Sequence, residues 1–562
     1  MSLKPIYGKA PMTDLKALAL RCGRLSLQDE NAGKLYALLS ARLDCVPFWA
    51  PAFRLAAMLK NDPMQEMCAR VILDAVAAQQ ANGAYDEALR ADVDKASAVW
   101  AMYEMTADKA LVESLMRWCA HLDAVWADVM GNTDIRVCAA DLLDVLCNLY
   151  RVTGKKAVLK LCERIRQEGM NWTGVLHTFS VQRPMKRIMP VEELLDSMSQ
   201  EDGTENGFYT RQYMTCRADL LADGARSSAL LSTISGNGQE YAAAATGWKK
   251  IARYHGAACG GTTGDPTLEG NAPSAAVSTA SVGAWLEAFA AQLETNDDAW
   301  AGDEMEKLMV NAASAALCDG GVLRFQRVNS LGADAGDWGC YYAAAESVGE
   351  VASMARLARG YADALQSAVM TTPAGIRVNM LVPGSYTVRL GGEAAKVTVE
   401  GNQVKVSLKK DTEAAMTIRV PGWVDDSAYI RVNEDGADSV KPGTFFAITR
   451  VWHDGDTVTV SFPETVRVEK GYHQSLCIYQ GSKLMAMPVT RADWAYAAAG
   501  EPEKVDGQVM LTVVPVNDWR AAGLIPFDMP ICPEHSGEKK TVALKPYGET
   551  AVRLAQFPRS VD

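Results

Sequence analysis

Two different hydrophobic periods divide the chain near Gly375. Up to about residue 370, apolar residues recur at the spacing of one face of an α-helix, whereas beyond it they alternate with polar residues as in a strand. The alternating runs are IRVNMLV, SYTVRL, AKVTVE, QVKVSL and MTIRV, with turn-forming sequences between them. The pattern predicts a helical domain at residues 1–370. At residues 371–562 it predicts antiparallel β-sandwich structure in one or two sub-domains.

The helical region repeats loosely as pairs of helices. An apolar-periodic segment, a short polar break and a second helix recur, with breaks near Asn61, Ala107, Gly154, Gly236 and Asn296. A helical hairpin cannot bury its apolar face alone, so neighbouring hairpins must stack on one another. Six hairpins closed into an (α/α)6 toroid are the favoured arrangement, and an open solenoid is the alternative.

Composition narrows the class of protein. The 562 residues carry a net charge of −12 and a pI near 5.2, which argues against a nucleic-acid partner because such a partner selects a basic surface. The N-terminal sequence lacks the apolar stretch of a signal peptide, and no run approaches the roughly eighteen apolar residues of a membrane span. The 13 cysteines include no C-x-x-C pair. We therefore expect a cytoplasmic protein with no membrane partner and no cofactor. The sequence is consistent with either a monomer or a homo-oligomer.

Seven sequence elements carry a resemblance that covers most of the chain. They are FWAPAFRLAAML, AVAAQQANGAY, YHGAACGGTTGDPTLEGNAP, WAGDEMEKLMVNAASAAL, MTIRVPGW, ITRVWHDGDTVTVSFP and LKPYGETAVRLAQFP. Their order resembles the β-L-arabinofuranosidases of glycoside hydrolase family 127. The resemblance implies an (α/α)6 barrel followed by β-sandwich domains. It also implies a mechanism in which a zinc-bound cysteine is the nucleophile and a glutamate is the acid/base.

The residues that carry this chemistry in the family are replaced here. The position of the acid/base glutamate holds Pro266, and the two metal-ligand positions of a Glu-x-Cys motif hold Ser278 and Ala280. Of a pair of cysteines in the third motif, Cys340 remains and its neighbour is Tyr341. One thiolate cannot hold a zinc ion, so no metal is expected. The resemblance therefore implies a site of the family's shape without its zinc–cysteine mechanism.

Two acids in the glycine-rich stretch 260–281 are the leading catalytic candidates. Asp265 and Glu269 are four residues apart in a loop expected at the barrel mouth. Glycoside hydrolysis most often needs two carboxyls about 5 Å or about 6.5–9.5 Å apart, and such a loop spans either distance. In the alternative interpretation, Asp265 caps a turn and Glu269 is solvated.

Cys340 is the third catalytic candidate, as a nucleophile. Without zinc or a neighbouring cation its thiol should stay protonated, and a lone cysteine is usually a small buried hydrophobe. Asp337 and Glu346 compete with it for the role. His255, at the entrance of the glycine-rich loop, could serve as an acid/base, but a structural or solvent-exposed histidine is the favoured interpretation.

Five residues are candidates for substrate binding. Trp338 could stack on a sugar ring, and so could Tyr341 and Tyr342. Asp337, directly before Trp338, is a further candidate for substrate binding. Gln326 and Asn329 form the Gln-x-x-Asn element that survives from the family pattern, and amides can recognise hydroxyl groups. Asp223 stands where many relatives have histidine. Ordinary packing is the alternative for the aromatic residues, and local capping is the alternative for the amides.

Three functions are consistent with these residues. The first is a glycoside hydrolase that acts on a plant-type or other glycan with a rebuilt active site. The second is a catalytically silent relative that binds a glycan or a protein. The third, by analogy of fold alone, is a carbohydrate lyase or epimerase. The loops around Asp223, 260–273 and 326–340 are expected to converge on one mouth of the barrel, because alternate connections in a toroid of hairpins lie at the same end.

Overall fold

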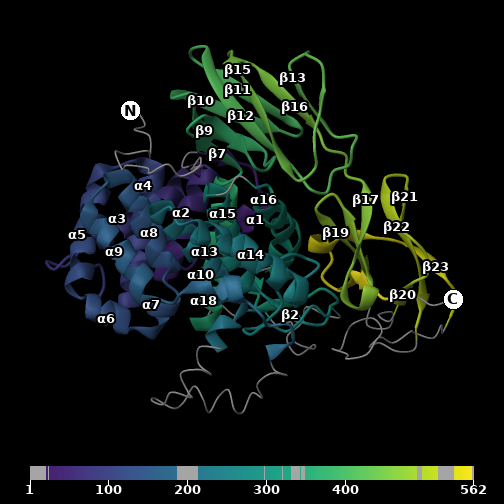
Figure 1. The fold of residues 1–562 in the computed structure, drawn as a ribbon, viewed down its shortest axis with the longest axis horizontal. Helices are drawn as coiled ribbons and strands as arrows, with labels where there is room; N and C mark the ends of the chain where they lie inside the picture. Colours follow the sequence, from purple (N-terminus) through teal and green to yellow (C-terminus); the bar gives the residue numbers. More distant parts are fainter. Residues whose placement is uncertain are drawn as a thin grey trace.

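The chain folds into a helical toroid followed by two β units (Figure 1). The computed structural model describes residues 21–22, 25–185, 213–295, 298–318, 321–330, 342–343, 348–489, 496–516 and 537–559. Within these residues the last long helix ends at Gln366 and the first strand of the β region begins at Val369. The predicted fold class is confirmed. None of the described helices has the length and apolar content needed to cross a membrane.

Six of the described helices form a closed inner ring. They are α2 (Trp49–Met58), α4 (Leu89–Thr106), α8 (Ala140–Thr153), α13 (Ala218–Ser235), α15 (Thr279–Thr295) and α18 (Val348–Gln366). Each packs against the next, and α18 packs back against α2. Helices α15 and α18 approach closely, since a Cβ built on Gly360 would lie 2.2 Å from the carbonyl oxygen of Gly283. The ring is therefore a toroid and not an open solenoid.

Outer helices cover this ring. In the described residues they are α1 (Glu30–Ser40), α3 (Asp62–Ala77), α5 (Lys109–Ala124), α9 (Lys156–Glu168), α14 (Gly238–His255) and α16 (Trp300–Leu308). Five of them follow the inner helix of their own hairpin. The sixth, α1, comes first in the chain and packs against α18, the last inner helix, so the two ends of the helical region close the ring.

The predicted breaks are the turns between inner and outer helices. Ala107, Gly154 and Gly236 end α4, α8 and α13 in the left-handed conformation, with φ of 57°, 63° and 66°. Asn61 immediately precedes α3, and Asn296 lies outside the described residues. Because these short turns gather at the C-terminal ends of the inner helices, the longer connections gather at the N-terminal ends. We call that end the mouth.

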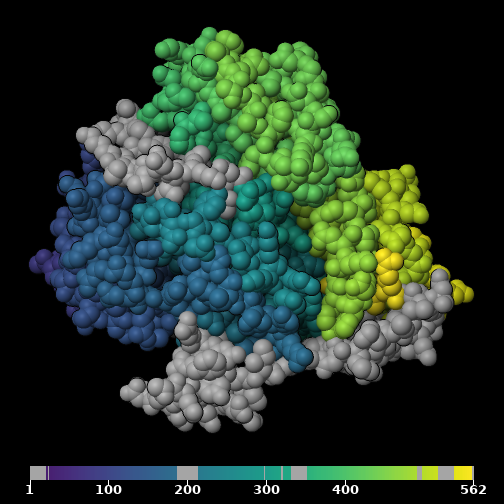
Figure 2. Space-filling model, in the orientation of Figure 1, coloured from purple at the N-terminus to yellow at the C-terminus, as the bar shows by residue number. Residues whose placement is uncertain are grey.

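A β-sandwich covers the end of the toroid opposite the mouth (Figures 1 and 2). One sheet has the order β1 (Leu25–Leu27), β9 (Gly384–Leu390), β10 (Glu393–Glu400), β11 (Gln403–Leu408), β16 (Thr457–Ser461), β13 (Tyr429–Val432) and β14 (Asp438–Ser439). The other has the order β15 (Thr444–Trp452), β12 (Thr412–Val420), β8 (Gly375–Val378) and β7 (Val369–Thr372). Alternate residues of both sheets enter one core. The sheets are antiparallel except that β8 and β12 pair in parallel, which the alternating sequence pattern does not reveal.

A second β unit lies beside the toroid and has its own core. One of its sheets contains β17 (Val466–Lys470), β18 (Leu476–Gln480), β19 (Lys483–Pro488) and the short strands β24 (Lys545–Pro546), β25 (Arg553–Leu554) and β26 (Gln556–Phe557). The other contains β20 (Tyr496–Ala498), β21 (Glu503–Val505), β22 (Gln508–Pro515) and β23 (Lys540–Ala543). Asn311, in the π-helical turn Met309–Ala313 after α16, fixes this unit to the toroid. Its amide donates to the carbonyl oxygen of Ser482 at 2.9 Å and accepts from the N–H of Leu484 at 2.8 Å.

Candidate functional site

Three segments meet at the mouth of the toroid, and we call them the mouth loops: residues 213–217, 256–278 and 321–330. Strand β2 (Ala276–Ser278) pairs with β5 (Phe325–Arg327), which joins the second segment to the third. The N–H of Leu268 donates to the carbonyl oxygen of Cys216 at 2.9 Å, which joins the first segment to the second. In Figure 1, β2 lies at the end of the toroid away from the sandwich.

Asp265 is a half-buried carboxyl at the rim of this mouth. Its side chain is 16% exposed, and its Oδ2 lies 3.3 Å from Nε of Arg324. Burial raises the pKa of Asp265, because water that would stabilise its charge is excluded. The Arg324 guanidinium opposes this rise and the nearby Glu269 carboxylate adds to it. Asp265 therefore holds a proton to higher pH than an ordinary aspartate does.

Glu269 braces the same loop. Its Oε2 accepts a hydrogen bond from the backbone N–H of Ala276 at 2.9 Å, so the carboxylate connects the two ends of the turn. It lies four residues after Asp265 in the same loop, and its charge adds to the rise in the pKa of Asp265. The structure therefore brings both candidate acids together, and Glu269 also has a structural role.

His255 holds the glycine-rich mouth loop in place through hydrogen bonds of its ring. The ring is fully buried, Nδ1 accepts the N–H of Gly270 at 3.0 Å, and Nε2 lies 3.1 Å from the carbonyl oxygen of Val181. Since Nδ1 accepts, we assign the proton to Nε2, which donates to Val181. Burial lowers the pKa of His255 to about 4. The ring is therefore neutral near pH 7 and positions the loop that carries Asp265.

Gln326 is buried and its amide is occupied by the protein. Nε2 donates to the carbonyl oxygen of Ala312 at 2.6 Å, and Oε1 accepts from the Tyr547 hydroxyl at 3.0 Å and from Nη2 of Arg553 at 3.2 Å. These contacts do not support the predicted role in substrate binding. Gln326 instead ties the third mouth loop to the C-terminal β unit.

Asn329 makes the same connection. Its Nδ2 donates to the carbonyl oxygen of Gln556 at 2.9 Å, and its Oδ1 accepts from the backbone N–H groups of Ala555 and Gln556 at 2.9 and 3.0 Å. Only 1% of the residue is exposed, so its contacts do not support substrate binding either. The Gln-x-x-Asn element therefore serves to dock two domains.

Asp223 lies on α13 and is buried in an ion pair. Arg356 of α18 binds its carboxylate, and the thiol of Cys138 donates to its Oδ2 at 2.8 Å. Burial raises the pKa of Asp223, and Arg356 opposes the rise. Asp223 is therefore not a free group at the rim, and it belongs to a larger network beneath the mouth.

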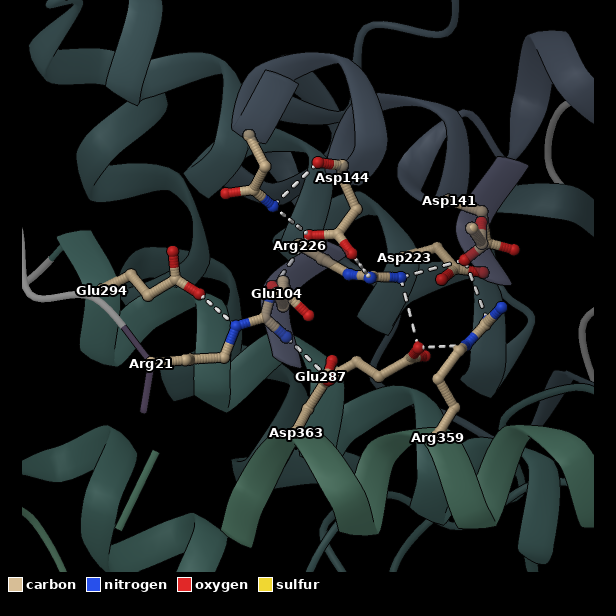
Figure 3. A network of polar contacts seen from close by, with 12 residues as sticks. Arg21, Glu104, Asp141, Asp144, Asp223, Arg226, Glu287, Glu294, Arg359 and Asp363 are labelled. Atoms are coloured by element: carbon tan, nitrogen blue, oxygen red, sulfur yellow. Dashed lines mark hydrogen bonds and ion pairs between the residues drawn. The ribbon is translucent and has the colours of Figure 1, made fainter. Parts of the chain in front are cut away.

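The sequence did not reveal this network, and Figure 3 shows part of it. Every inner helix contributes to it, and we call it the axial charge network. It consists of Arg21, Arg54, Arg90, Arg151, Arg226, Arg356, Arg359, Asp94, Glu104, Asp141, Asp144, Asp223, Glu287, Glu294 and Asp363. For example, Arg226 places Nη1 2.9 Å from Asp141 and Nη2 3.0 Å from Asp144. Buried charges are tolerated here because each has partners of the opposite sign.

At the mouth end of the network, two carboxyls share one arginine. Nη2 of Arg90 lies 2.8 Å from Asp141 and 3.4 Å from Asp94, and the Arg90 side chain is 52% exposed. Burial raises the pKa of Asp94 more than Arg90 lowers it. Although burial acts in the same direction on Asp141, the surrounding arginines hold its pKa well below the usual range. The environments of the two carboxyls therefore separate their pKa values.

The donor set does not fit the zinc ion of the resembled family. The hydroxyl of Ser278 accepts the N–H of Ser281 at 3.1 Å and so caps the start of α15, while Ala280 and Pro266 have no side-chain donor atom. Across the part of the chain that the structure describes, no group of three or more His, Cys, Asp or Glu side chains could hold a metal ion.

The remaining candidates lie outside the described residues. They are the nucleophile candidate Cys340, the binding candidates Asp337 and Trp338, and the competing acid Glu346. Their roles stay predictions from the sequence.

Comparison with known proteins agrees with this architecture. The model of the middle domain of glycoside hydrolase family 127, described as β-L-arabinofuranosidase, matches residues 376–464. None of the curated proteins compared with the chain matches it.

Solved structures match over nearly the whole length. A structure described as a glycoside hydrolase has a TM-score of 0.70 at 13% identity, covering 99% of this chain and 100% of its own. A family 127 β-L-arabinofuranosidase from Geobacillus stearothermophilus T6 has a TM-score of 0.63 at 17% identity, covering 94% and 93%. A family 127 β-arabinofuranosidase has a TM-score of 0.64 at 13% identity, covering 97% and 98%. At these identities the structural matches show the fold.

The resemblance seen in the sequence is thus confirmed from two sides: residues 376–464 match the middle domain of glycoside hydrolase family 127, and the chain shares the fold of that family's β-L-arabinofuranosidases.

Proposed function

We propose that this protein is a glycoside hydrolase that acts on a plant-type or other glycan at the mouth of the toroid, using carboxyl groups in place of zinc–cysteine chemistry. The observation that carries the proposal is the environment of Asp265. This carboxyl is largely buried at the rim where the mouth loops meet, and burial raises its pKa. A general acid must keep its proton near the working pH, and a raised pKa favours that.

Glu269 supplies the second carboxyl of the proposal. Hydrolysis of a glycoside needs a proton donor and a nucleophile or base, and these are most often two carboxyls on either side of the scissile bond. Asp265 would protonate the leaving oxygen while Glu269 attacks the anomeric carbon or activates water. The hydrogen bond from Ala276 to Glu269 supports this role because it fixes the orientation of the carboxylate.

Arg217, in the first mouth loop, adds a guanidinium to this rim. It pairs with Asp219, its Nε 3.1 Å from Oδ1 and its Nη2 2.7 Å from Oδ2. A glycan at the rim would therefore meet guanidinium and carboxylate groups, which include Arg324 beside Asp265 and Arg217 beside Asp219. Both kinds of group form strong hydrogen bonds with hydroxyls.

A catalytically silent glycan-binding protein is the second candidate, and the pairing within the network favours it. At the mouth end, Asp141 has three arginine partners and Asp223 has Arg356. A carboxylate with a lowered pKa, such as Asp141, cannot donate a proton at neutral pH. Carboxylates and guanidinium groups that are fixed in ion pairs can still hydrogen-bond the hydroxyls of a glycan, so this arrangement is consistent with binding alone.

A comparison of single variants tests the proposal. Wild type, Asp265→Asn, Glu269→Gln and the control Glu400→Gln, an exposed acid at the end of β10, are assayed with aryl glycosides and arabinose-containing plant oligosaccharides. Loss of a general acid or base should lower kcat by roughly 10²–10⁴-fold in the first two variants and leave the control unchanged. If wild type hydrolyses a substrate and both variants match it, the two acids are not catalytic. If wild type hydrolyses nothing but binds a glycan in calorimetry, the silent candidate replaces the proposal.

A further inference from the structure

A cavity of about 450 Å³ lies between the toroid and the β-sandwich, away from the mouth. We call it the junction cavity. On the toroid side its walls come from the start of α1, the last turns of α18 and the end of α16 with the π-helical turn that follows it. On the sandwich side they come from the segment after β8, the turn between β10 and β11, and the segments after β12 and β16. Its volume is within the range of small-molecule sites, roughly 300–1,000 Å³. Because both domains form it, the cavity exists only when they are docked.

Aromatic side chains form part of the wall on the sandwich side. Trp423 follows β12 and Phe462 follows β16, and both are half-buried against the main core. Their ring faces are apolar surfaces of the kind that pack against the C–H faces of a sugar ring. The cavity can therefore hold the flat side of a saccharide.

Two polar atoms of residues in this wall have no partner. Within the described residues, Nε1 of Trp423 and Oδ1 of Asn379 are buried and make no hydrogen bond. The other end of the Asn379 amide is fixed, since Nδ2 donates to the carbonyl oxygen of Ser367 at 2.8 Å. An unpaired buried donor and an unpaired buried acceptor both cost stability. Both atoms are closed off from the cavity itself, so the contacts with a ligand fall to the aromatic rings and to the exposed amide of Asn402.

The charges around the cavity favour a neutral ligand. The carboxylates that line it already have partners within the protein, which are Tyr361 for Asp29, Arg419 and Ser482 for Glu306, and Lys483 for Glu464. Arg419, the guanidinium in the wall, is itself held between Asp303 and Glu306. An anionic ligand would therefore meet three carboxylates and no uncommitted arginine in this wall. A cationic ligand would compete with the partners that these carboxylates already have.

We infer that the junction cavity is a second saccharide-binding site, which takes a neutral mono- or disaccharide between the rings of Trp423 and Phe462 and the exposed amide of Asn402. It is separate from the mouth and does not depend on hydrolysis there. A bound saccharide would contact both domains at once and so stabilise their docked arrangement.

The test observes Trp423 directly. The full chain is labelled with 5-fluorotryptophan, and the fluorine resonance that is missing from Trp423→Phe is assigned to Trp423. L-Arabinose, D-galactose and D-glucose are titrated well beyond millimolar concentration, with D-glucuronate as the charged comparison. Asn402→Ala is the main variant, since its exposed side chain can be removed without disturbing the fold. Tyr429→Ala, which removes an exposed aromatic side chain from β13 of the same sandwich, is the matched control.

The Trp423 resonance should shift saturably with at least one neutral sugar and not with D-glucuronate. Removal of the Asn402 amide should weaken the apparent Kd about tenfold, the effect of losing one hydrogen bond, while Tyr429→Ala leaves it unchanged. Asp265→Asn should also leave it unchanged, because the mouth is not involved. The inference is overturned if no neutral sugar moves the resonance, if Asn402→Ala binds as wild type does, or if Asp265→Asn abolishes the shift. Because the readout is not activity, a protein that hydrolyses nothing but shows the shift refutes the proposed hydrolase and supports this site.

Discussion

Acid should destabilise the mouth through a single residue, His255. Burial lowers the pKa of its ring to about 4, whereas an unfolded histidine titrates near 6.5. Between these pH values the histidine is protonated in the unfolded chain and neutral in the folded chain. The contribution of His255 to the free energy of unfolding is therefore fully present above this window and is lost as the pH falls through it. A difference of roughly 2.5 pKa units, at about 1.36 kcal/mol each, corresponds to about 3 kcal/mol. That is a large part of the roughly 5–15 kcal/mol that stabilises a typical domain.

His255→Asn isolates this contribution. Asparagine can accept the Gly270 N–H with its Oδ1, as Nδ1 of the ring does at 3.0 Å, but it does not titrate. Urea unfolding of wild type and variant is measured from pH 7 to pH 4, and only the difference between them is interpreted. Wild type should lose about 3 kcal/mol more than the variant over this range. Hydrogen exchange of peptides from residues 256–275, corrected for intrinsic rates, should rise in wild type over the same range, because a protonated Nδ1 cannot accept from Gly270.

His453→Gln is the control, since its side chain is 55% exposed and it should follow the wild-type curve. Parallel curves for wild type and His255→Asn would refute the reasoning. They would mean that the folded chain accepts a proton at His255 as readily as the unfolded chain does.

Three further substitutions test the packing of the toroid. Gly360→Ala puts a methyl group 2.2 Å from the Gly283 carbonyl oxygen, so we expect a loss of about 3 kcal/mol or more in urea unfolding, whereas Gly33→Ala, with open space at its Cβ, should be harmless. Arg356→Met leaves buried carboxylates without their partner and should cost about 3–5 kcal/mol in the same measurement, and a stable variant would show that the pairing is dispensable. Asn329→Ala leaves three buried backbone groups unsatisfied and should lower the melting temperature, with a cost of about 2–3 kcal/mol; unchanged melting would contradict its docking role.

Local chemistry made the architecture predictable from the sequence. The breaks at Ala107, Gly154 and Gly236 could be recognised because a helix that ends in the left-handed conformation selects glycine or a short polar turn, and that choice is visible in a few residues. The change of period near Gly375 is equally local. The parallel pairing of β8 with β12 is not local, because alternation is the same for either strand direction.

The site was less predictable because its partners are distant in the sequence. Gln326 and Asn329 suggested hydroxyl recognition, but their amides are occupied by Tyr547, Arg553 and Gln556, more than 200 residues further along the chain. Arginines on the inner helices resemble solvated residues when the sequence is read alone. One signal was available. Most residues of α13 are small or apolar and are buried all round the helix, so Arg226 in this helix had to be buried and paired as well.

The order of the helices along the chain also has a consequence for synthesis. Helix α1 packs on α2 and, across the junction between the two ends of the helical region, on α18, while β1 is stabilised by pairing with β9, whose last residue is Leu390. At roughly 5–20 residues per second, a ribosome needs on the order of tens of seconds to go from the first of these segments to the last. During that interval α1 can pack on α2 but not yet on α18, and the hairpins already made form an open arc. The nascent chain therefore passes through a period in which the faces of α1 and α2 that meet α18 are uncovered, and that period ends when the last inner helix emerges and the arc closes.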